Sequence, residues 1–260
     1  MKKLLLSVVT LAALSGTQAI AADIPIKAAR PMAAAPVAYR WTGCFIGAAG
    51  GGTWGRSRHV SGDAGTFGFD ITDNYDVSGG IAGVEYGCNW QSGQWVLGTE
   101  SDFSWTNLRG GANNLAPFFN TLSVSNTREH WFSTTRVRVG LLADPRLLFY
   151  ATGGLATARV EAFVDATATG FGVVSESRTR WGWTAGAGLE YALGGGWSAK
   201  ADYLYARFNE REYFNPPPVG FAIRNNVPLE QHVVRVGINY KFTNCFFFLF
   251  GCNDAIVARY

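Results

Sequence analysis

The chain has 260 residues, a formal net charge of +3, 16% charged residues, 32 glycines and 14% aromatic residues. So small a net charge gives no reason to expect a nucleic-acid partner. Few charges together with many glycines and aromatic residues are unusual for a soluble domain, whose surface needs more charge.

The first 21 residues have the form of a secretory signal peptide. Two lysines precede a short apolar run that ends in the letters AIA. The run is shorter than the roughly 20 apolar residues of a membrane helix, so we expect export and cleavage before Ala22. Residues 22–40 are rich in Ala and Pro and lack strand periodicity, which indicates a periplasmic linker.

Eight segments then show the two-residue alternation of β-strands. Each is about as long as a tilted membrane strand. They cover residues 41–54, 78–90, 94–106, 129–142, 147–159, 179–193, 197–208 and 230–242.

The connections between these segments alternate strictly between long and short. Tight turns are predicted at Gln91-Ser92-Gly93, at Asp144-Pro145-Arg146 and at Gly194-Gly195-Gly196. The connections near 55–77, 107–128, 160–178 and 209–229 run to roughly twenty residues. This order places all long loops at one rim, as in outer-membrane barrels with short periplasmic turns and long extracellular loops.

The two faces of each segment indicate which side meets lipid. In the segment 197–208, Trp197, Tyr203 and Tyr205 share one face, while Lys200 and Asp202 share the other. Aromatic residues also gather at both ends of the segments, as at the two interfaces of a membrane barrel. The sequence therefore predicts an all-β, eight-stranded antiparallel up-and-down transmembrane barrel over residues 41–242, with its apolar face outward.

A soluble lipocalin-type barrel is the competing fold, because it also has eight up-and-down strands. It would place the aromatic side chains inside and leave glycines and isolated charges outside. The composition of the two faces argues against it.

The opposite face carries charges of both signs, which predicts a lumen filled by ion pairs. By parity, five acids and five bases point inward. They are Glu85, Glu100, Asp102, Glu190 and Asp202, and Arg136, Arg138, Lys200, Arg235 and Lys241.

Several stretches in a fixed order carry a resemblance to a known family. They are ADIPIKAA, RWTGCFIGAAGGGTWG, GGIAGVEYGCNWQSGQWVLGTESDF, VRVGLLADPRLLFYATGGLATARV, GWTAGAGLEYAL and HVVRVGINYKF. In this order they resemble the small outer-membrane immunogenic proteins of alphaproteobacteria, also described as porin-family or OmpA-like eight-stranded barrels. The resemblance spans essentially residues 1–242. It implies an integral outer-membrane protein that supports envelope integrity and is exposed as a surface antigen, and it brings no catalytic residue with it.

The end of the chain departs from that family pattern. Family chains normally stop at a terminal aromatic residue in the position of Phe242, which forms part of the barrel-assembly signal. Here a Cys- and Phe-rich tail continues over residues 243–260. Either the signal is read internally at Phe242, or Tyr260 takes its place.

Four cysteines in an exported chain suggest disulfides, with three possible pairings. Cys44 begins the first segment and Cys88 ends the second, so an antiparallel hairpin brings them to the same rim. Cys245 and Cys252 enclose a short loop in the tail. We therefore expect the pairs Cys44–Cys88 and Cys245–Cys252, with free thiols as the alternative.

Some eight-stranded barrels are enzymes, so catalysis is a further possibility. The candidates are His59, His130 and His232, with Ser133 close to His130. A Ser/His site needs both side chains within hydrogen-bond reach, and strict alternation would place His130 and Ser133 on different faces. We expect no enzyme activity, no cofactor and no metal site.

Two functions therefore remain for a protein of the bacterial outer membrane. One is a structural barrel with a surface-interaction and antigen role, and the other is a porin-type diffusion channel. Eight strands leave an interior just wide enough for side chains, which favours the first. The expected partners are outer-membrane lipids and lipopolysaccharide, the barrel-assembly machinery, and host or surface ligands of the extracellular loops.

Overall fold

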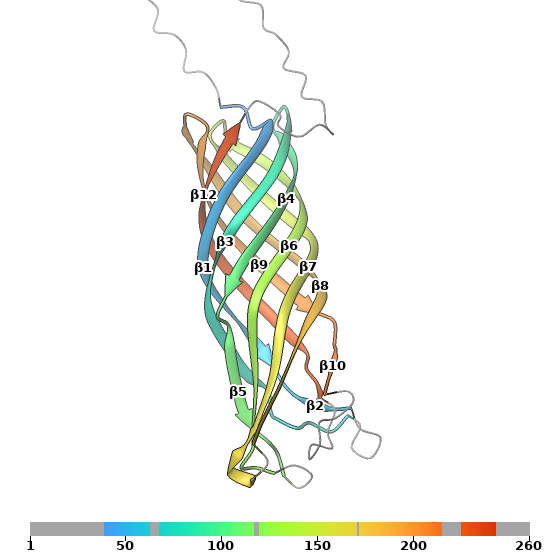
Figure 1. Cartoon of the computed structure of the whole chain (residues 1–260). Coiled ribbons are helices and arrows are strands. Elements are labelled where there is room, and N and C mark those ends of the chain that lie inside the picture. The colour runs from blue at the N-terminus through green and yellow to red at the C-terminus, as the bar shows by residue number, and fades with distance from the viewer. Residues whose placement is uncertain (1–38, 63–67, 117–119, 171, 215–224, 243–260) are drawn as a thin grey trace, which may run out of the picture. The chain divides into compact units, whose positions relative to one another are not determined.

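Eight long strands follow one another around a closed sheet in the computed structural model (Figure 1), which describes residues 39–62, 68–116, 120–170, 172–214 and 225–242. They are β1 (Gly43–Ser57), β3 (Tyr75–Ser92), β4 (Trp95–Thr106), β6 (Val124–Asp144), β7 (Leu147–Ala166), β8 (Gly172–Gly194), β9 (Trp197–Phe208) and β12 (Leu229–Phe242). Each pairs antiparallel with the next, and β12 pairs with β1. The predicted all-β, eight-stranded barrel is confirmed.

Short elements lie at the end of the barrel from which the long connections leave (Figure 1). β5 (Arg109–Asn113) pairs with β3 and β6. β2 (Val60–Ser61), β10 (Glu212–Tyr213) and β11 (Asn225–Asn226) form a separate three-stranded sheet. This sheet, called the cap sheet below, ties the connection after β1 to the connection after β9.

The three tight turns join the strands at the opposite end. They lie at Gly93-Gln94, Pro145-Arg146 and Gly195-Gly196. Gly93, Gly195 and Gly196 have positive φ angles, which glycine adopts without the steric cost that a Cβ brings. The turn residues in the sequence therefore predict these three positions to within a residue or two.

At the other end the strands run further than predicted. β7 and β8 continue to Ala166 and from Gly172, so the connection expected over 160–178 shrinks to residues 167–171, which include the 3₁₀ turn η1 (Thr167–Thr169). The cause is a change of pattern. Val160, Ala162 and Val164 point inward there and are buried, whereas the outward positions carry the charged residues Arg159, Glu161 and Asp165 besides Phe163. This pattern reverses the alternation of the membrane part.

In the rest of the wall the large aromatic and aliphatic side chains that were expected on the outer face do point outward. The outward residues Tyr86, Trp105 and Val236 are 65%, 62% and 65% exposed, whereas the inward Arg136 is only 2% exposed. An isolated sheet with that outer surface would be insoluble in water, so the arrangement suits a lipid environment. No helix in the described residues is long and apolar enough to cross a membrane.

Candidate functional site: the filled lumen

Strand register places opposite charges next to each other at mid-height of the lumen. Glu100 of β4 is the register partner of Arg136 in β6, and Glu190 of β8 is the partner of Lys200 in β9. Asp202 of β9 faces Arg235 of β12 in the same way. Directly opposed residues of an antiparallel pair have their side chains on the same face, within contact distance. Neighbouring strands thus build two of these three pairs as ion contacts, Glu100–Arg136 and Asp202–Arg235.

Longer contacts across the barrel join these pairs into one network. Arg138 lies 3.0 Å from Glu190 and 3.3 Å from Glu100, which come from different sides of the ring. Lys200 Nζ lies 2.8 Å from Glu100 and 2.7 Å from Glu85. All five side chains are at most 3% exposed. Buried charges in such contact offset the cost of leaving water, which single buried charges do not.

A second group of contacts anchors Arg235 and Arg136 to the aspartates. Arg235 lies 3.3 Å from Asp102 and 3.0 Å from Asp202. Arg136 lies 3.0 Å from Asp102. The lumen network, as the term is used below, consists of Glu85, Glu100, Asp102, Arg136, Arg138, Glu190, Lys200, Asp202 and Arg235.

Lys241 does not join this network, which corrects the expected balance of five acids and five bases. Its Nζ donates to the backbone carbonyl oxygen of Arg40 and lies 4.2 Å from the ring centre of Tyr39. Strand alternation correctly predicted that Lys241 is on the inward face. However, Lys241 is the penultimate residue of β12, so its side chain lies at the rim. The network therefore holds five acids and four bases.

Neutral side chains that the sequence reasoning overlooked complete the network. Asn89 accepts a hydrogen bond of 2.8 Å from Arg138, and Ser198 donates one of 2.5 Å to Glu190. Thr134 donates to Asp102 and Asn239 donates to Glu190. All four share the inward parity of the charged residues on their strands. The same alternation could therefore have identified them.

The missing side chain of an inward-facing glycine leaves room for a long guanidinium side chain. A Cβ on Gly98 would lie 2.3 Å from Asn89 Oδ1 and 3.2 Å from Arg138 Cγ. The Arg138 guanidinium also packs on aromatic faces, 4.8 Å from the ring centre of Phe45 and 5.1 Å from that of Tyr150. Such cation–π contacts stabilise a buried arginine.

Apolar layers lie on both sides of the network, and parity reasoning from the charges alone missed them. The layer toward the tight turns is called the lower apolar layer, although Figure 1 draws these turns at the top. It consists of Trp41, Val96, Leu148, Tyr150 and Ala192. Toward the long connections, the upper apolar layer consists of Tyr75, Val77, Ile81, Leu108, Phe132, Ala156, Ala158, Val160, Leu204, Ala206, Phe208, Leu229 and Val233. Within the described residues the lumen is thus filled in successive layers.

A buried polar group follows next to the cap sheet, around His59. The His59 ring nitrogens lie 3.4 Å from Thr127 Oγ1 and 3.3 Å from the Asn225 side-chain amide. Thr127 is also hydrogen-bonded to the Tyr75 hydroxyl at 2.6 Å. Burial, together with the positive charge of Arg180, lowers the pKa of His59 to about 3. A neutral, packed histidine of this kind is a structural residue.

The structure does not pair His130 with Ser133. The His130 Nε2 atom lies 3.1 Å from Glu161 Oε2, and the Ser133 hydroxyl donates to the Asp102 carbonyl oxygen at 2.7 Å. The expected reason was wrong, however. A register shift between Glu129 and Trp131 makes His130 an extra residue in β6, and such a bulge breaks strict alternation.

His232 also has a packing environment on the outer wall. Its Nδ1 atom lies 2.7 Å from the Tyr203 hydroxyl, and its ring stacks on Trp54 with centroids 5.8 Å apart. Within the described part of the chain, no group of three or more His, Cys, Asp and Glu side chains could hold a metal ion.

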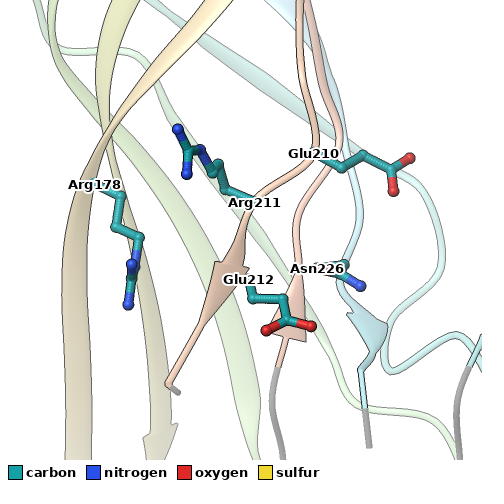
Figure 2. Close-up of a pocket in the computed structure, with 5 residues that line it drawn as sticks. All are labelled: Arg178, Glu210, Arg211, Glu212 and Asn226. Carbon is teal, nitrogen blue, oxygen red and sulfur yellow. The ribbon is translucent and has the colours of Figure 1, made fainter. Parts of the chain in front are cut away.

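A polar pocket of about 300 Å³ lies at the long-connection end. Arg178, Glu210, Arg211, Glu212 and Asn226 line it, and Figure 2 shows Arg178 and Arg211 on one side of the view and the two glutamates on the other. Arg178 is already paired with Glu176 at 2.5 Å. Equal numbers of acids and bases favour neither an anionic nor a cationic ligand.

The disulfide Cys44–Cys88 is present and closes the first hairpin. The two residues are register partners in β1 and β3, which confirms the first expected pair. Cys245, Cys252 and the rest of residues 243–260 lie outside the described residues. Phe242 is the last residue of β12 and is half-buried.

A family of known proteins matches this barrel over nearly its whole length. The outer membrane protein beta-barrel domain matches residues 32–242. The chain belongs to this family. A 31 kDa outer-membrane immunogenic protein of Brucella melitensis is 35% identical over 257 residues, covering 93% of this chain and 100% of the relative. A 22 kDa outer membrane protein of Rhizobium leguminosarum bv. viciae is 31% identical, covering 78% of each chain.

Solved structures with a likeness to this chain include other outer-membrane proteins. OprG from Pseudomonas aeruginosa has 15% sequence identity and a TM-score of 0.49, covering 80% of this chain and 99% of that one. Neisserial surface protein A has 13% identity and a TM-score of 0.39, with 77% and 98% covered. Family membership rests on the sequence matches. The protein is therefore an outer-membrane β-barrel protein, and the relatives named above are barrel proteins of the outer membrane.

Proposed function

We propose that the protein is a closed, non-conducting barrel that supports the outer membrane and presents its long connections as a surface antigen. The layered filling of the lumen carries this proposal. The lumen network is bounded by an apolar layer on each side. An ion that crossed would have to displace both apolar layers and break buried ion pairs.

The charge balance of the wall also supports a closed barrel rather than a diffusion channel. A selective pore carries an excess of one sign of charge along its path. Here each base of the network contacts at least two acids, as Arg136 does with Glu100 and Asp102. The charges are thus engaged with each other and do not offer a path to a solute.

The surface role draws on the barrel ends and on the names of the relatives. Long connections at one rim and tight turns at the other match the extracellular and periplasmic ends of outer-membrane barrels. The Brucella relatives are named immunogenic proteins. We propose the same orientation here, with a cleaved signal peptide, insertion by the barrel-assembly machinery through the Phe242 end of β12, and surface ligands at the long connections.

Single-channel conductance of the purified mature protein in planar bilayers tests the closed lumen. We expect no steady conductance under conditions in which a large trimeric porin conducts. Insertion is checked in the same preparation by protease protection of the barrel. Steady open-channel current from inserted wild-type protein would establish the channel alternative.

A further inference from the structure

Three arginines form a patch on the outer wall at and just beyond the aromatic residues of the long-connection rim. Arg109 of β5, Arg128 of β6 and Arg159 of β7 are all exposed, and these strands lie side by side in Figure 1. Arg109 and Arg128 are register partners, so their side chains share the outward face. Arg159 is the partner of Trp131, which is itself the partner of Trp105.

The facing pair Arg109–Arg128 is unfavourable by itself, because like charges directly opposite each other destabilise a sheet. In the described part of the chain, neither of them nor Arg159 lies within ion-pair distance of a carboxylate. Other arginines at this rim do have acidic partners. They are Arg56 with Asp76 at 3.6 Å, Arg58 with Asp70 at 3.3 Å, and Arg207 with Glu230 at 3.5 Å.

One acid lies inside the patch without neutralising it. Glu161 is the register partner of Arg128, yet its Oε2 atom contacts His130 at 3.1 Å. The Arg128 guanidinium instead lies over the Phe163 ring, 5.4 Å from its centre. Three arginines against one glutamate leave an excess of positive charge on this side of the wall.

We propose that Arg109, Arg128 and Arg159 bind the phosphate groups of lipid A in the outer leaflet of the membrane. Trp105 and Trp131 mark the depth at which headgroups meet the apolar band, and the patch starts level with them at Arg159 and continues beyond them to Arg128 and Arg109. A guanidinium group holds phosphate oxygens in bidentate geometry. A phosphate between Arg109 and Arg128 turns their repulsion into two attractive contacts.

The proposal rests on the orientation proposed above, because lipid A occupies only the outer leaflet. The two ideas can be tested apart. Binding in detergent micelles, which have no sidedness, tests the patch. Labelling of intact cells at residues 120–122 and at the Gly195-Gly196 turn tests the orientation, and only the first site should react from outside.

The binding experiment compares two double variants of the full mature chain. R109Q/R128Q removes the facing pair, and the matched control R58Q/R207Q removes two arginines that have acidic partners. Both variants lose the same charge from the same rim. Binding of bisphosphorylated lipid A is measured by native mass spectrometry and by tryptophan fluorescence. Lipid A without phosphates and inorganic phosphate are the other probes.

We expect R109Q/R128Q to bind bisphosphorylated lipid A about tenfold more weakly or worse, while R58Q/R207Q binds like wild type. Lipid A without phosphates should bind weakly to all three proteins. Equal weakening of both variants would show general attraction to a basic rim and overturn the site. Unchanged binding by R109Q/R128Q would overturn it as well. Displacement of lipid A by an equal concentration of inorganic phosphate would show a free-phosphate site.

Discussion

Lys200 contributes more ion contacts to the lumen than its single charge suggests. Its Nζ atom lies 2.7 Å from Glu85, 2.8 Å from Glu100 and 3.3 Å from Asp202. Within the described network, Lys200 is the cation that pairs with Glu85. An acid that loses its cation in a buried site keeps the full cost of leaving water.

The variant K200M therefore tests the network at the residue scale. It leaves five acids with three bases, and we expect a loss of about 3–5 kcal/mol in the free energy of unfolding at neutral pH. The loss should shrink in acid, where protonation neutralises the surplus carboxylates. Urea unfolding in micelles, followed by tryptophan fluorescence, measures both effects.

R207M is the matched control, because Arg207 is 61% exposed in its side chain and pairs with Glu230. An exposed pair contributes at most about 1 kcal/mol. Equal losses for K200M and R207M would contradict a stabilising role of the buried network.

Much of the lumen could be predicted residue by residue, and the failures have physical causes. Charges such as Arg136 and Glu190 are identified by parity, because a charge on a lipid-facing position is costly. Phe132 and Leu204 are not, because an apolar side chain suits both faces of the wall. Lys241 has the right parity but lies at the rim, where a side chain can reach backbone carbonyl groups.

At the scale of elements, sequence patterns predict the membrane part of each strand better than its extension. Inside the membrane, apolar side chains point outward, and the alternation is clear. Beyond it, the extension of β7 buries Val160, Ala162 and Val164 on the inner face, so its alternation reverses and resembles that of a loop. The bulge at His130 adds a residue to β6, and the extra residue has no signature in the sequence.

His59 connects the cap sheet to the barrel wall. Its backbone N–H donates to Thr72 Oγ1 at 3.0 Å, and its ring contacts Thr127 of β6 and Asn225 of β11. Unfolding of this region exposes the imidazole, whose pKa then returns to its ordinary value of 6.5 from about 3. The open form therefore binds a proton that the closed form does not bind between these values.

We therefore predict that acid loosens the cap sheet. Its stability should be constant above pH 6.5, fall by up to about 1.4 kcal/mol per pH unit between pH 6.5 and 3, and level off below pH 3. Amide hydrogen exchange at Asn225 and Asn226, corrected for intrinsic rates, measures this dependence. The variant H59Q does not titrate, so its slope should be smaller by that amount. Equal slopes in H59Q and wild type would assign the acid effect to other groups.

For the whole molecule, the order of the layers matters more than any one of them. The lower apolar layer, the lumen network and the upper apolar layer lie in series along the barrel axis. Barriers in series are limited by the highest one, so opening the middle layer does not open the path. This differs from a lumen closed by charges alone, in which loss of Arg136 and Arg138 would create a leak.

The last prediction compares two multiple variants in the bilayer assay. R136A/R138A should unfold at lower urea concentration, because five acids then face two bases, but it should give no steady conductance. The second variant combines R136A/R138A with F132A and F208A in the upper layer and L148A and Y150A in the lower layer. It should conduct, provided that protease protection shows a folded barrel. The pair Phe132–Phe208 packs edge to face with centroids 6.2 Å apart, so its removal leaves space that water can enter only from the adjoining charged network, once both layers are opened. Steady current through R136A/R138A alone would mean that the apolar layers do not seal the lumen, and the charges alone would then be the gate.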